Sequence, residues 1–384
     1  MLSDRVDQIA WNEFALADWE LFSQMADREG IAPLMYWKLK DSPVEIPPST
    51  FNFLRSTYYQ TLAQNTLMYQ ELERILKALD AAGIPVIVLK GAALAATVYE
   101  DIGLRPMGDL DLLVKEQHLQ KALDLICSLG YVQEPMPHEK FNQQIGYDVH
   151  LWNGLNDKMK VELHWQLVVG GDDWPSANMG WFWEERVSPT LDKDAQNDLL
   201  YNLTKLSPEA SLLYSVGHLL LQHGVKQARL LWFFDIQILL SKHMQTLNWQ
   251  SLLKEANELH WTAALLTALA LVEQLFSTSL RDTPAYDLLR QVRRSPDNDS
   301  LFPGRMLRTR TKATDVWSSL QMLDHGKRVR YALGMVFPNP DFMRWRYRPR
   351  PAWLWPLCYP YRFFMMIKAA IVTYSILVLP RRER

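Results

Sequence analysis

Cysteine is scarce in this chain of 384 residues, which contains only Cys127 and Cys358. The two lie far apart in the sequence and do not have the spacing of metal-binding cysteines. A framework of disulfides is therefore excluded, and the reducing cytoplasm is the expected location. The N-terminus also lacks a basic segment followed by an apolar run, so we expect no secretory signal peptide.

Net charge is nearly absent as well, because 41 Lys and Arg residues balance 43 Asp and Glu residues and leave −2. This sum conceals an uneven distribution. Residues 303–384 contain 16 Lys and Arg residues against 4 Asp and Glu residues, whereas residues 1–302 are acidic. Near-neutrality therefore excludes no class of partner, and the acidic body and the basic C-terminal end have to be considered separately.

Long apolar runs are missing except for residues 363–380, where Lys368 is the only charged side chain. Its 18 residues reach only the lower limit of length for a helix that spans a bilayer. Arg362 and Arg381 flank the run. The pattern suits either a helix that packs on the protein or a helix that contacts a membrane.

The segment 343–350 alternates arginines with aromatic side chains. This pattern suits docking on the acidic body, contact with an anionic membrane surface, or phosphate contacts combined with base stacking on a nucleic acid. Nucleic acid is the least favoured of the three. Peripheral membrane contact stays open as a role for the C-terminal region.

The hydrophobic pattern divides the chain into five regions. Apolar residues recur every three to four positions in residues 1–82 and again in 208–302, which predicts helices in both. Residues 83–170 combine short β-branched runs with helical stretches, and a Trp-rich connector, 171–207, follows. Residues 303–384 form the basic C-terminal region. We therefore predict an α+β protein in which a small mixed β-sheet is embedded in a mostly helical chain.

The region 83–170 reads as strand, helix, strand, helix, strand, strand. A continuous apolar run predicts a buried first strand, and a turn-rich segment joins the last two strands. The expected elements are strands at 84–89, 109–114, 147–152 and 159–167, and helices at 92–99 and 117–129.

Asp109 and Asp111 are the first candidates for chemistry. Residues two apart on a strand point to the same face, so the two carboxylates are expected side by side. Like charges this close repel one another unless a cation lies between them, and a hard ion such as Mg²⁺ prefers carboxylate oxygens. The Asp-x-Asp pattern alone is a weak signal, because some metal-dependent glycosyltransferases also carry it.

Three further residues strengthen the signal. Gly91 lies at a junction between strand and helix, where free N–H groups can meet a phosphate. Arg105, in the loop before the aspartates, is placed to reach a triphosphate. Glu162 lies on a later strand that a mixed sheet can bring beside Asp109 and Asp111. Three carboxylates around one or two Mg²⁺ ions suit in-line attack at a nucleotide phosphate.

Two histidines accompany these carboxylates. His164 follows Glu162 by two residues, so it shares the same strand face, and we expect it to support a nearby carboxylate. His150 lies on the preceding strand and is expected to pair across to this one. We interpret both as supporting groups and not as the principal ligands of a metal.

Three titratable residues of the helical region are interpreted as structural. His218 and His223 are five residues apart, which does not place two ligands on one face of an α-helix, so we expect them to be structural or to line a pocket. Asp235 lies in an apolar helix and needs a buried partner, for which Arg229 is the candidate.

The string LKGAALAATVYEDIGLRPMGDLDLLV at 89–114, followed by VELHWQL at 161–167, resembles the uncharacterised nucleotidyltransferase family of the DNA polymerase beta-like superfamily. A looser likeness continues through HLLLQHGVKQARLLWFFDIQILL at 218–240. The resemblance covers roughly residues 19–280 in organisation, although only 89–114 and 161–165 are specific. It implies a polymerase beta-like nucleotidyltransferase core at 83–170.

The resemblance also implies a mechanism. An acceptor hydroxyl attacks the α-phosphate of an NTP, pyrophosphate leaves, and a nucleoside monophosphate is transferred. Asp109 and Asp111 would hold Mg²⁺, with Mn²⁺ as an alternative. Glu162 would complete the metal site and accept the proton of the hydroxyl.

The phosphate loop departs from the usual pattern of the superfamily. Gly-Ser or Gly-Gly is usual there, whereas this chain has Lys90 and Gly91. The resemblance therefore implies that Lys90 replaces the serine and contacts a phosphate directly. Together with Arg105, it would neutralise the charge that develops on the phosphates.

Two other functions stay open. One is a metal-dependent glycosyltransferase, although a single strand–helix unit before the Asp pair argues against it. The other is a catalytically weak binding module in a membrane-linked or polysaccharide-related assembly, against which the intact carboxylates argue. The sequence does not identify the base of the NTP or the acceptor, which could be a small molecule, glycan, protein or RNA.

Overall fold

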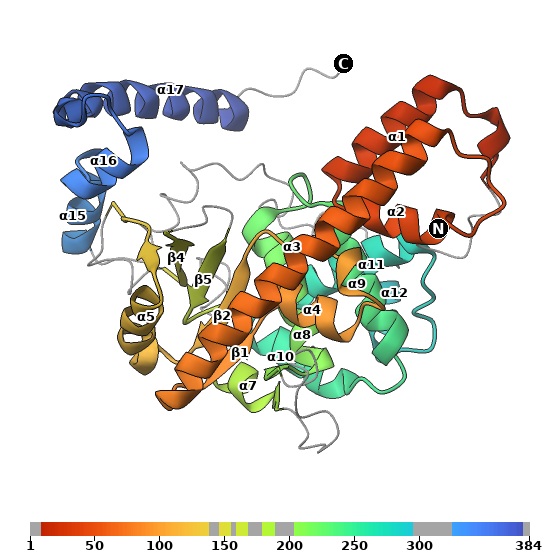
Figure 1. The fold of residues 1–384 in the computed structure, drawn as a ribbon. Helices are drawn as coiled ribbons and strands as arrows, with labels where there is room; N and C mark the ends of the chain where they lie inside the picture. The colour runs from red at the N-terminus through yellow and green to blue at the C-terminus, as the bar shows by residue number, and fades with distance from the viewer. Residues whose placement is uncertain are drawn as a thin grey trace.

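The computed structural model describes residues 9–137, 146–154, 159–167, 179–188, 203–294 and 325–378. Within these ranges one mixed sheet is surrounded by helices (Figure 1). Most of the Trp-rich connector and the beginning of the basic region lie outside the described residues, as do 379–384.

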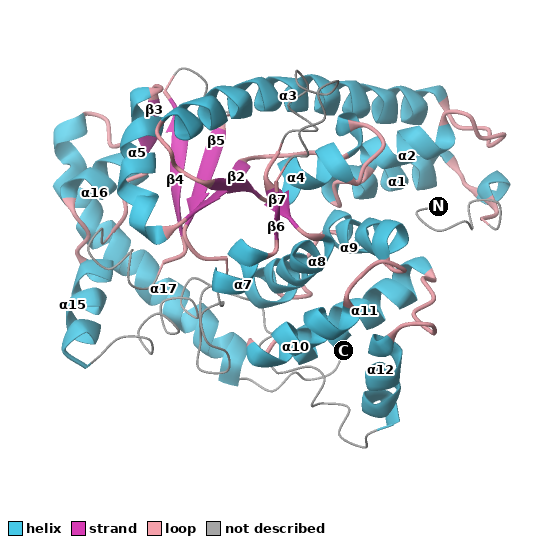
Figure 2. Cartoon of the chain, turned by 90° about the horizontal axis from the view of Figure 1, so that it is seen from below, coloured by secondary structure: helices cyan, strands magenta, loops and turns pink. Residues whose placement is uncertain are grey.

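Three helices form the N-terminal region: α1 (Leu16–Arg28), α2 (Ala32–Leu39) and α3 (Pro48–Ala81). Pro48 begins α3 at the position where a missing N–H costs nothing. Figure 2 shows α3 extending from α1 and α2 across to the sheet. Its C-terminal half places fully buried Leu72, Ile75 and Leu79 in the same core as the sheet residues. The long helix therefore joins the N-terminal helices to the sheet.

The sheet has seven strands in the order β3-β4-β5-β2-β1-β7-β6. Neighbours β2 and β5 are parallel, as are β1 and β7, and the other pairs are antiparallel. The predicted α+β class with a mixed sheet is therefore confirmed. The strands are β1 (Val86–Val88), β2 (Leu110–Val114), β3 (Tyr131–Gln133), β4 (Asp148–Asn153), β5 (Lys160–His164), β6 (Arg186–Val187) and β7 (Lys205–Leu206).

The register of three neighbouring strands brings polar side chains into one row. In the parallel pair β2–β5, Asp111 lies opposite Glu162. In the antiparallel pair β4–β5, His150 also lies opposite Glu162. Residues directly opposite on neighbouring strands share a face and touch one another. The alternate residues Leu112 and Leu163 are fully buried in the core on the other face.

Two helices cover the core near β1 and β2, and a second group of helices follows the sheet in sequence. The first two are α4 (Lys90–Thr97) and α5 (Leu119–Ser128). The others are α7 (Met179–Glu184), α8 (Pro208–Val216), the π-helix η6 (Gly217–His223), α9 (Leu230–His243), α10 (Trp249–Glu258), α11 (Thr262–Phe276) and α12 (Pro284–Arg294). Short 3₁₀ turns are found at Trp11–Glu13, Ile102–Leu104 and Glu116–His118.

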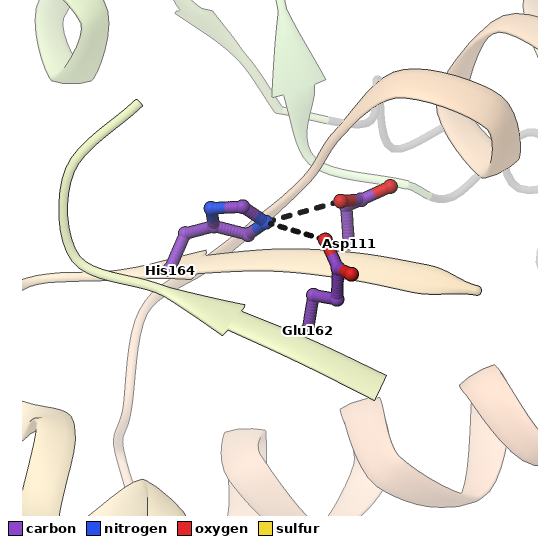
Figure 3. Close-up of side chains that lie close together, drawn as sticks. All are labelled: Asp111, Glu162 and His164. Atoms are coloured by element: carbon purple, nitrogen blue, oxygen red, sulfur yellow. Dashed lines mark hydrogen bonds and ion pairs between the residues drawn. The ribbon is translucent and has the colours of Figure 1, made fainter. Parts of the chain in front are cut away.

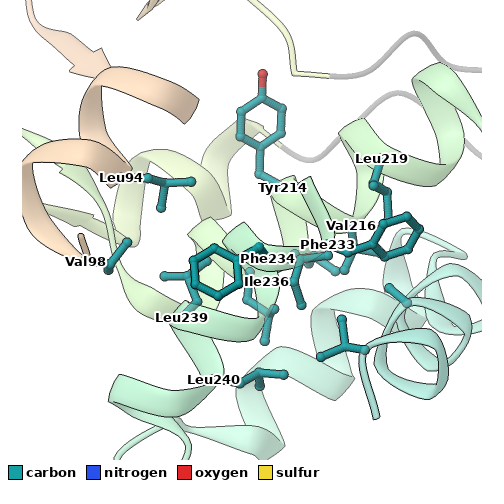
Figure 4. Close-up of a cluster of buried hydrophobic side chains, with 14 of the residues drawn as sticks. Leu94, Val98, Tyr214, Val216, Leu219, Phe233, Phe234, Ile236, Leu239 and Leu240 are labelled. Carbon is teal, nitrogen blue, oxygen red and sulfur yellow. The ribbon is translucent and has the colours of Figure 1, made fainter. Parts of the chain in front are cut away.

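A shared hydrophobic core holds the sheet region and the second group of helices together. Leu94 and Val98 of α4 belong to one cluster with Phe234 and Leu239 of α9 (Figure 4). Burial of large aliphatic and aromatic side chains of this kind stabilises a fold by about 2 kcal/mol per side chain. The two regions are thus packed into one body.

The C-terminal helices form a peripheral unit made of α15 (His325–Val336), α16 (Pro340–Tyr347), the 3₁₀ helix η8 (Ala352–Leu357) and α17 (Cys358–Val378). Figure 1 shows it on the opposite side of the molecule from α1. Asn339 donates a hydrogen bond of 3.1 Å to the Met136 carbonyl. None of the helices in the described ranges combines the length and the apolar character needed to cross a bilayer.

Candidate active site

The centre of the site consists of Asp111, Glu162 and His164, whose ligand atoms lie within 4.8 Å of one another. Figure 3 shows the imidazole of His164 pointing at both carboxylates from the strand that also carries Glu162. Its Nε2 lies 3.0 Å from Asp111 Oδ1 and 3.7 Å from Glu162 Oε2. The side chain of Asp111 is 3% exposed and that of His164 is fully buried. Strand alternation on β5 and the parallel register of β2 and β5 produce this cluster.

Asp109 lies just before β2 and is more open than Asp111, with a side chain that is 38% exposed. It does not belong to the compact cluster of Asp111, Glu162 and His164. Desolvation in the cavity and the negative charges of Asp111 and Glu162 raise the pKa of Asp109 to about 7. The cations present therefore do not fully compensate three neighbouring carboxylates, and a further cation would be stabilised here.

Lys90 is the nearest cation to Asp111. Its Nζ lies 2.8 Å from Asp111 Oδ1 and 3.8 Å from Glu162 Oε2. Burial opposes its charge, but the attraction of Asp111 raises the pKa of Lys90 well above its usual range. Burial likewise opposes the charge of Asp111, but Lys90 and the bond from His164 lower the pKa of Asp111. The sequence predicts that the ammonium of Lys90 binds a phosphate. In this structure the ammonium is bound to Asp111 and Glu162 instead.

The backbone of Lys90 is unusual. It adopts φ of 42°, in the left-handed region that costs a side-chain-bearing residue energy. It is also the first residue of α4, so this turn aims both the ammonium and the free N–H groups of the helix end into the site. Gly91 follows, and a Cβ there would collide with the guanidinium of Arg105. Only glycine lets the helix end approach Arg105 this closely.

Arg105 is buried and bound to Asp235 of α9. Its Nε and Nη2 donate hydrogen bonds of 2.9 and 2.7 Å to the two carboxylate oxygens. The hydroxyl of Tyr99 donates a third bond of 2.6 Å to Asp235. The sequence interpretation that Arg229 is the partner is wrong, because Arg229 is exposed and Arg105 occupies that place. Arg105 still lines the cavity beside Gly91.

Two basic side chains surround Glu162 from neighbouring positions. Lys160 forms an ion pair with Glu162, and His150 Nε2 lies 3.4 Å from its Oε1. Burial opposes the positive charge of His150, but bonds to Asp148 and Glu134 raise the pKa of His150 to about 10. Burial also opposes the charge of Glu162, but His164 and the two lysines hold the pKa of Glu162 well below its usual range. Glu162 is thus ionised at neutral pH.

His164 is charged as well. Burial favours its neutral form, but the bonds to Asp111 and Glu162 raise the pKa of His164 to about 9. Its Nε2–H therefore donates to Asp111 at 3.0 Å and forms a longer ion pair with Glu162 at 3.7 Å. This is the carboxylate contact that the sequence predicts for His164.

A cavity of about 550 Å³ is lined by Lys90, Arg105, Asp109, Asp111, His150 and Glu162. One wall is charged and comes from the sheet and α4, with Lys90, Asp109, Asp111 and Glu162. Sequence analysis missed Lys160 and Asp148 near this wall, although both alternate with predicted residues on the same strand faces. The opposite wall comes from η6 and α9 and includes His218, Gln222, His223, Arg229, Leu231 and Trp232.

His218 and His223 correct a second expectation. Both line the cavity, but they do share a face, because Gly217–His223 form a π-helix and not an α-helix. Hydrogen bonds from i to i+5 place residues five apart above one another. The two Nε2 atoms are consequently 3.2 Å apart. No spacing rule for an α-helix detects this contact.

Comparison with solved structures gives weak likenesses. The antibiotic-resistance factor ANT(2'')-Ia matches with 14% identity and a TM-score of 0.34 over 55% of this chain and 97% of its own. A nucleotidyltransferase-like protein from Paracoccidioides brasiliensis matches with 16% identity and a TM-score of 0.32 over 54% of this chain and 87% of its own. A comparison with curated proteins gives no match.

The family profile described as uncharacterised nucleotidyltransferase matches residues 15–277. The match begins before α1 and ends just after α11, so it includes the sheet, both walls of the cavity and every carboxylate described above. The resemblance inferred from the sequence motifs is confirmed over this range. The chain belongs to the uncharacterised nucleotidyltransferase family.

Proposed function

We propose that the protein transfers a nucleoside monophosphate from an NTP to a hydroxyl of an acceptor, with release of pyrophosphate and with Mg²⁺ as the metal. The observation that carries the proposal is the meeting of Asp111 and Glu162 on paired strands, with Asp109 beside them and a helix N-terminus in the same cavity. Membership of the family supports transfer of a nucleotidyl group.

The donor set fits a hard divalent cation. Asp109, Asp111 and Glu162 offer carboxylate oxygens, and burial together with the two neighbouring carboxylates raises the pKa of Asp109, which supports a place for a further positive charge. These three residues would hold Mg²⁺, or Mn²⁺ as the alternative. When bound, the metal supplies charge stabilisation at the reacting phosphate.

The chain's own residues have distinct tasks in this proposal. Lys90 leaves Asp111 when the nucleotide enters and binds a phosphate, while the N–H groups at the start of α4 bind another. Glu162 accepts the proton of the acceptor hydroxyl after Lys90 has moved to the phosphate, because Lys90 is one of the cations that lower the pKa of Glu162. Arg105 stays on Asp235 and contributes positive potential from behind Gly91. His164 keeps the two carboxylates in place.

The test uses purified protein, NTPs radiolabelled at the α-phosphate, Mg²⁺ and a cell extract as the source of acceptor. We expect a labelled product from the wild type, and a loss of roughly 100-fold or more in Asp111→Asn and Glu162→Gln. Glu73→Gln is the matched control, because Glu73 forms an exposed ion pair with Lys77 far from the cavity lining.

Two results would contradict the proposal. Labelling that survives unchanged in both site variants would place the chemistry elsewhere. Nucleotide binding by the wild type without labelling of any fraction would favour the alternative of a binding module. A sugar nucleotide that donates its sugar and not its nucleotide would instead support the glycosyltransferase alternative.

For the C-terminal unit we propose contact with an anionic membrane surface, from the cytoplasmic side. Trp353, Leu357 and Phe364 are 72%, 67% and 65% exposed. They lie on η8 and α17, in a region rich in arginine. Exposed aromatic and aliphatic side chains among cations suit the boundary between lipid headgroups and acyl chains. The two free cysteines are compatible with a reducing compartment.

A further inference from the structure

The cavity has an aromatic wall for which the proposed reaction gives no role. His218, His223 and Trp232 form a compact aromatic cluster there. The ring centroid of Trp232 lies 5.0 Å from that of His218 and 4.6 Å from that of His223. The two imidazoles are themselves 4.6 Å apart. Three flat rings thus meet at one side of the cavity, and the carboxylates line the other side.

Local backbone geometry builds this cluster. Residues 217–223 form a π-helix directly after α8, which places His218 and His223 on one face. Single π-turns are rare and are found mostly at functional sites, because they cost hydrogen-bond geometry that an ordinary helix retains. Gln222 anchors the turn with a hydrogen bond of 3.1 Å to the Leu167 carbonyl. The sequence therefore maintains an unfavourable backbone form that presents two imidazoles to the cavity.

The imidazole of His218 is kept in its neutral form by its surroundings. Burial and the charges of Lys90 and His223 lower the pKa of His218 well below its usual range. A neutral imidazole offers one donor and one acceptor, as the edge of a nucleobase does. The opposite wall carries Lys90 and the carboxylates of Asp109, Asp111, Asp148 and Glu162. The cavity is consequently divided into a half rich in carboxylates and a mainly aromatic half, which also includes the exposed Arg229.

We propose that His218, His223 and Trp232 form the subsite for the base of the donor NTP. This inference rests on the proposed function. An NTP is divided in the same way as the cavity: its triphosphate is ionic, and its base is a flat, uncharged heterocycle. Stacking on aromatic side chains accepts every base, and the neutral imidazole of His218 adds a polar group beside the ring of the base.

The experiment compares two ligands by titration calorimetry in the presence of Mg²⁺: an NTP, and inorganic tripolyphosphate, which lacks base and ribose. We expect Trp232→Leu to weaken NTP binding roughly 5- to 100-fold, the range for loss of one base stack, and to leave tripolyphosphate binding unchanged. Trp232→Phe keeps a flat ring and should stay nearer to the wild type. His223→Leu repeats the test if Trp232→Leu does not fold.

The matched control is Trp37→Leu. Trp37 is also half-buried and lines a separate cavity of about 820 Å³ beside α2, so its loss should change neither ligand's affinity. Wild-type NTP affinity in both Trp232→Leu and His223→Leu would overturn the subsite, and so would an equal loss for both ligands. A wild type that binds neither ligand would overturn the nucleotide site itself, which separates failure of the proposed function from failure of this inference.

Discussion

Lys90 shows how much of the site depends on a single side chain. Its ammonium is the closest partner of Asp111, which is almost completely buried. Lys90→Met would leave that carboxylate without its cation, so we expect a loss of about 3 kcal/mol in the free energy of unfolding. Added Mg²⁺ should recover part of this loss by binding the same oxygens. Urea unfolding with and without Mg²⁺ measures both effects.

Lys77→Met is the control for this experiment. Lys77 pairs with Glu73 on the exposed face of α3, and such a pair contributes less than about 1 kcal/mol. If Lys90→Met is as stable as the wild type and indifferent to Mg²⁺, then Asp111 does not depend on Lys90 for its charge.

Asp235 gives a second prediction for a single residue. Asp235→Asn removes the charge that holds the guanidinium of buried Arg105, and we expect the unfolding free energy to fall by about 3 kcal/mol. Arg229→Ala, which alters the partner suggested by the sequence, should change it by less than about 0.5 kcal/mol because that side chain is exposed. Thermal unfolding of the two variants decides between the arginines, and equal effects would contradict the assigned pair.

The sequence predicts the positions of some site residues but not the contacts of others, and the reason is physical. Alternation along a strand is local, so Asp111, Glu162 and His164 could be placed on their faces without a structure. The pair of Arg105 and Asp235 joins residues 130 positions apart, and only the packing of α9 against the loop before β2 brings them together. Arg229 was closer in sequence, but closeness in sequence does not decide a tertiary contact.

Secondary-structure elements also differ in how well the sequence predicts them. The strands predicted at 109–114 and 147–152 correspond to β2 and β4 because each has enough residues to show a pattern. Strands β6 and β7 have two residues each, which is too short for any periodicity. The sequence did not predict the π-helical winding of η6, because residues five apart in an α-helix diverge by roughly 140° around the axis. Its apolar residues still predicted a helix, and only the winding was missed.

The lowered pKa of His218, in the π-helix η6, predicts how the stability of the fold changes with pH. The folded pKa of His218 is lowered, so the unfolded state binds a proton first as the pH falls below about 6.5. The stability contribution of His218 is present above that pH and is lost below it, at up to about 1.4 kcal/mol per pH unit. We expect His218→Gln to reduce the loss of stability between pH 7 and pH 5.

The measurement is the urea concentration at which half of the protein is unfolded, for wild type and His218→Gln, between pH 7 and pH 5. His150 and His164 act in the opposite direction, because their raised pKa values stabilise the fold below about 6.5 and lose this effect only as the pH rises through about 9 to 10. Asp109, whose pKa is raised to about 7, also takes up a proton in the acid range and stabilises the fold as the pH falls, so only the difference in slope between wild type and His218→Gln isolates His218. Identical slopes for wild type and His218→Gln would show that His218 can be protonated in the folded protein.

At the scale of the whole molecule, the C-terminal unit combines an excess of arginine with exposed aromatic and aliphatic side chains. We expect the protein to sediment with vesicles that contain phosphatidylserine and less with neutral phosphatidylcholine vesicles, with binding weakened by salt. Replacing Trp353 and Phe364 together by serine should remove most of this binding. Leu67→Ser, which alters an exposed leucine of α3, is the control. Equal binding to both kinds of vesicle would contradict an electrostatic contribution.

The buried bond between Arg105 and Asp235 has a mechanical consequence. Arg105 belongs to the loop that leads to the carboxylates, and Asp235 belongs to the helix that carries Trp232. The bond and the surrounding core therefore fix the width of the cavity before any substrate arrives. Any change in the spacing between the carboxylates and Trp232 would strain this buried ion pair, so the pair opposes movement of one wall relative to the other.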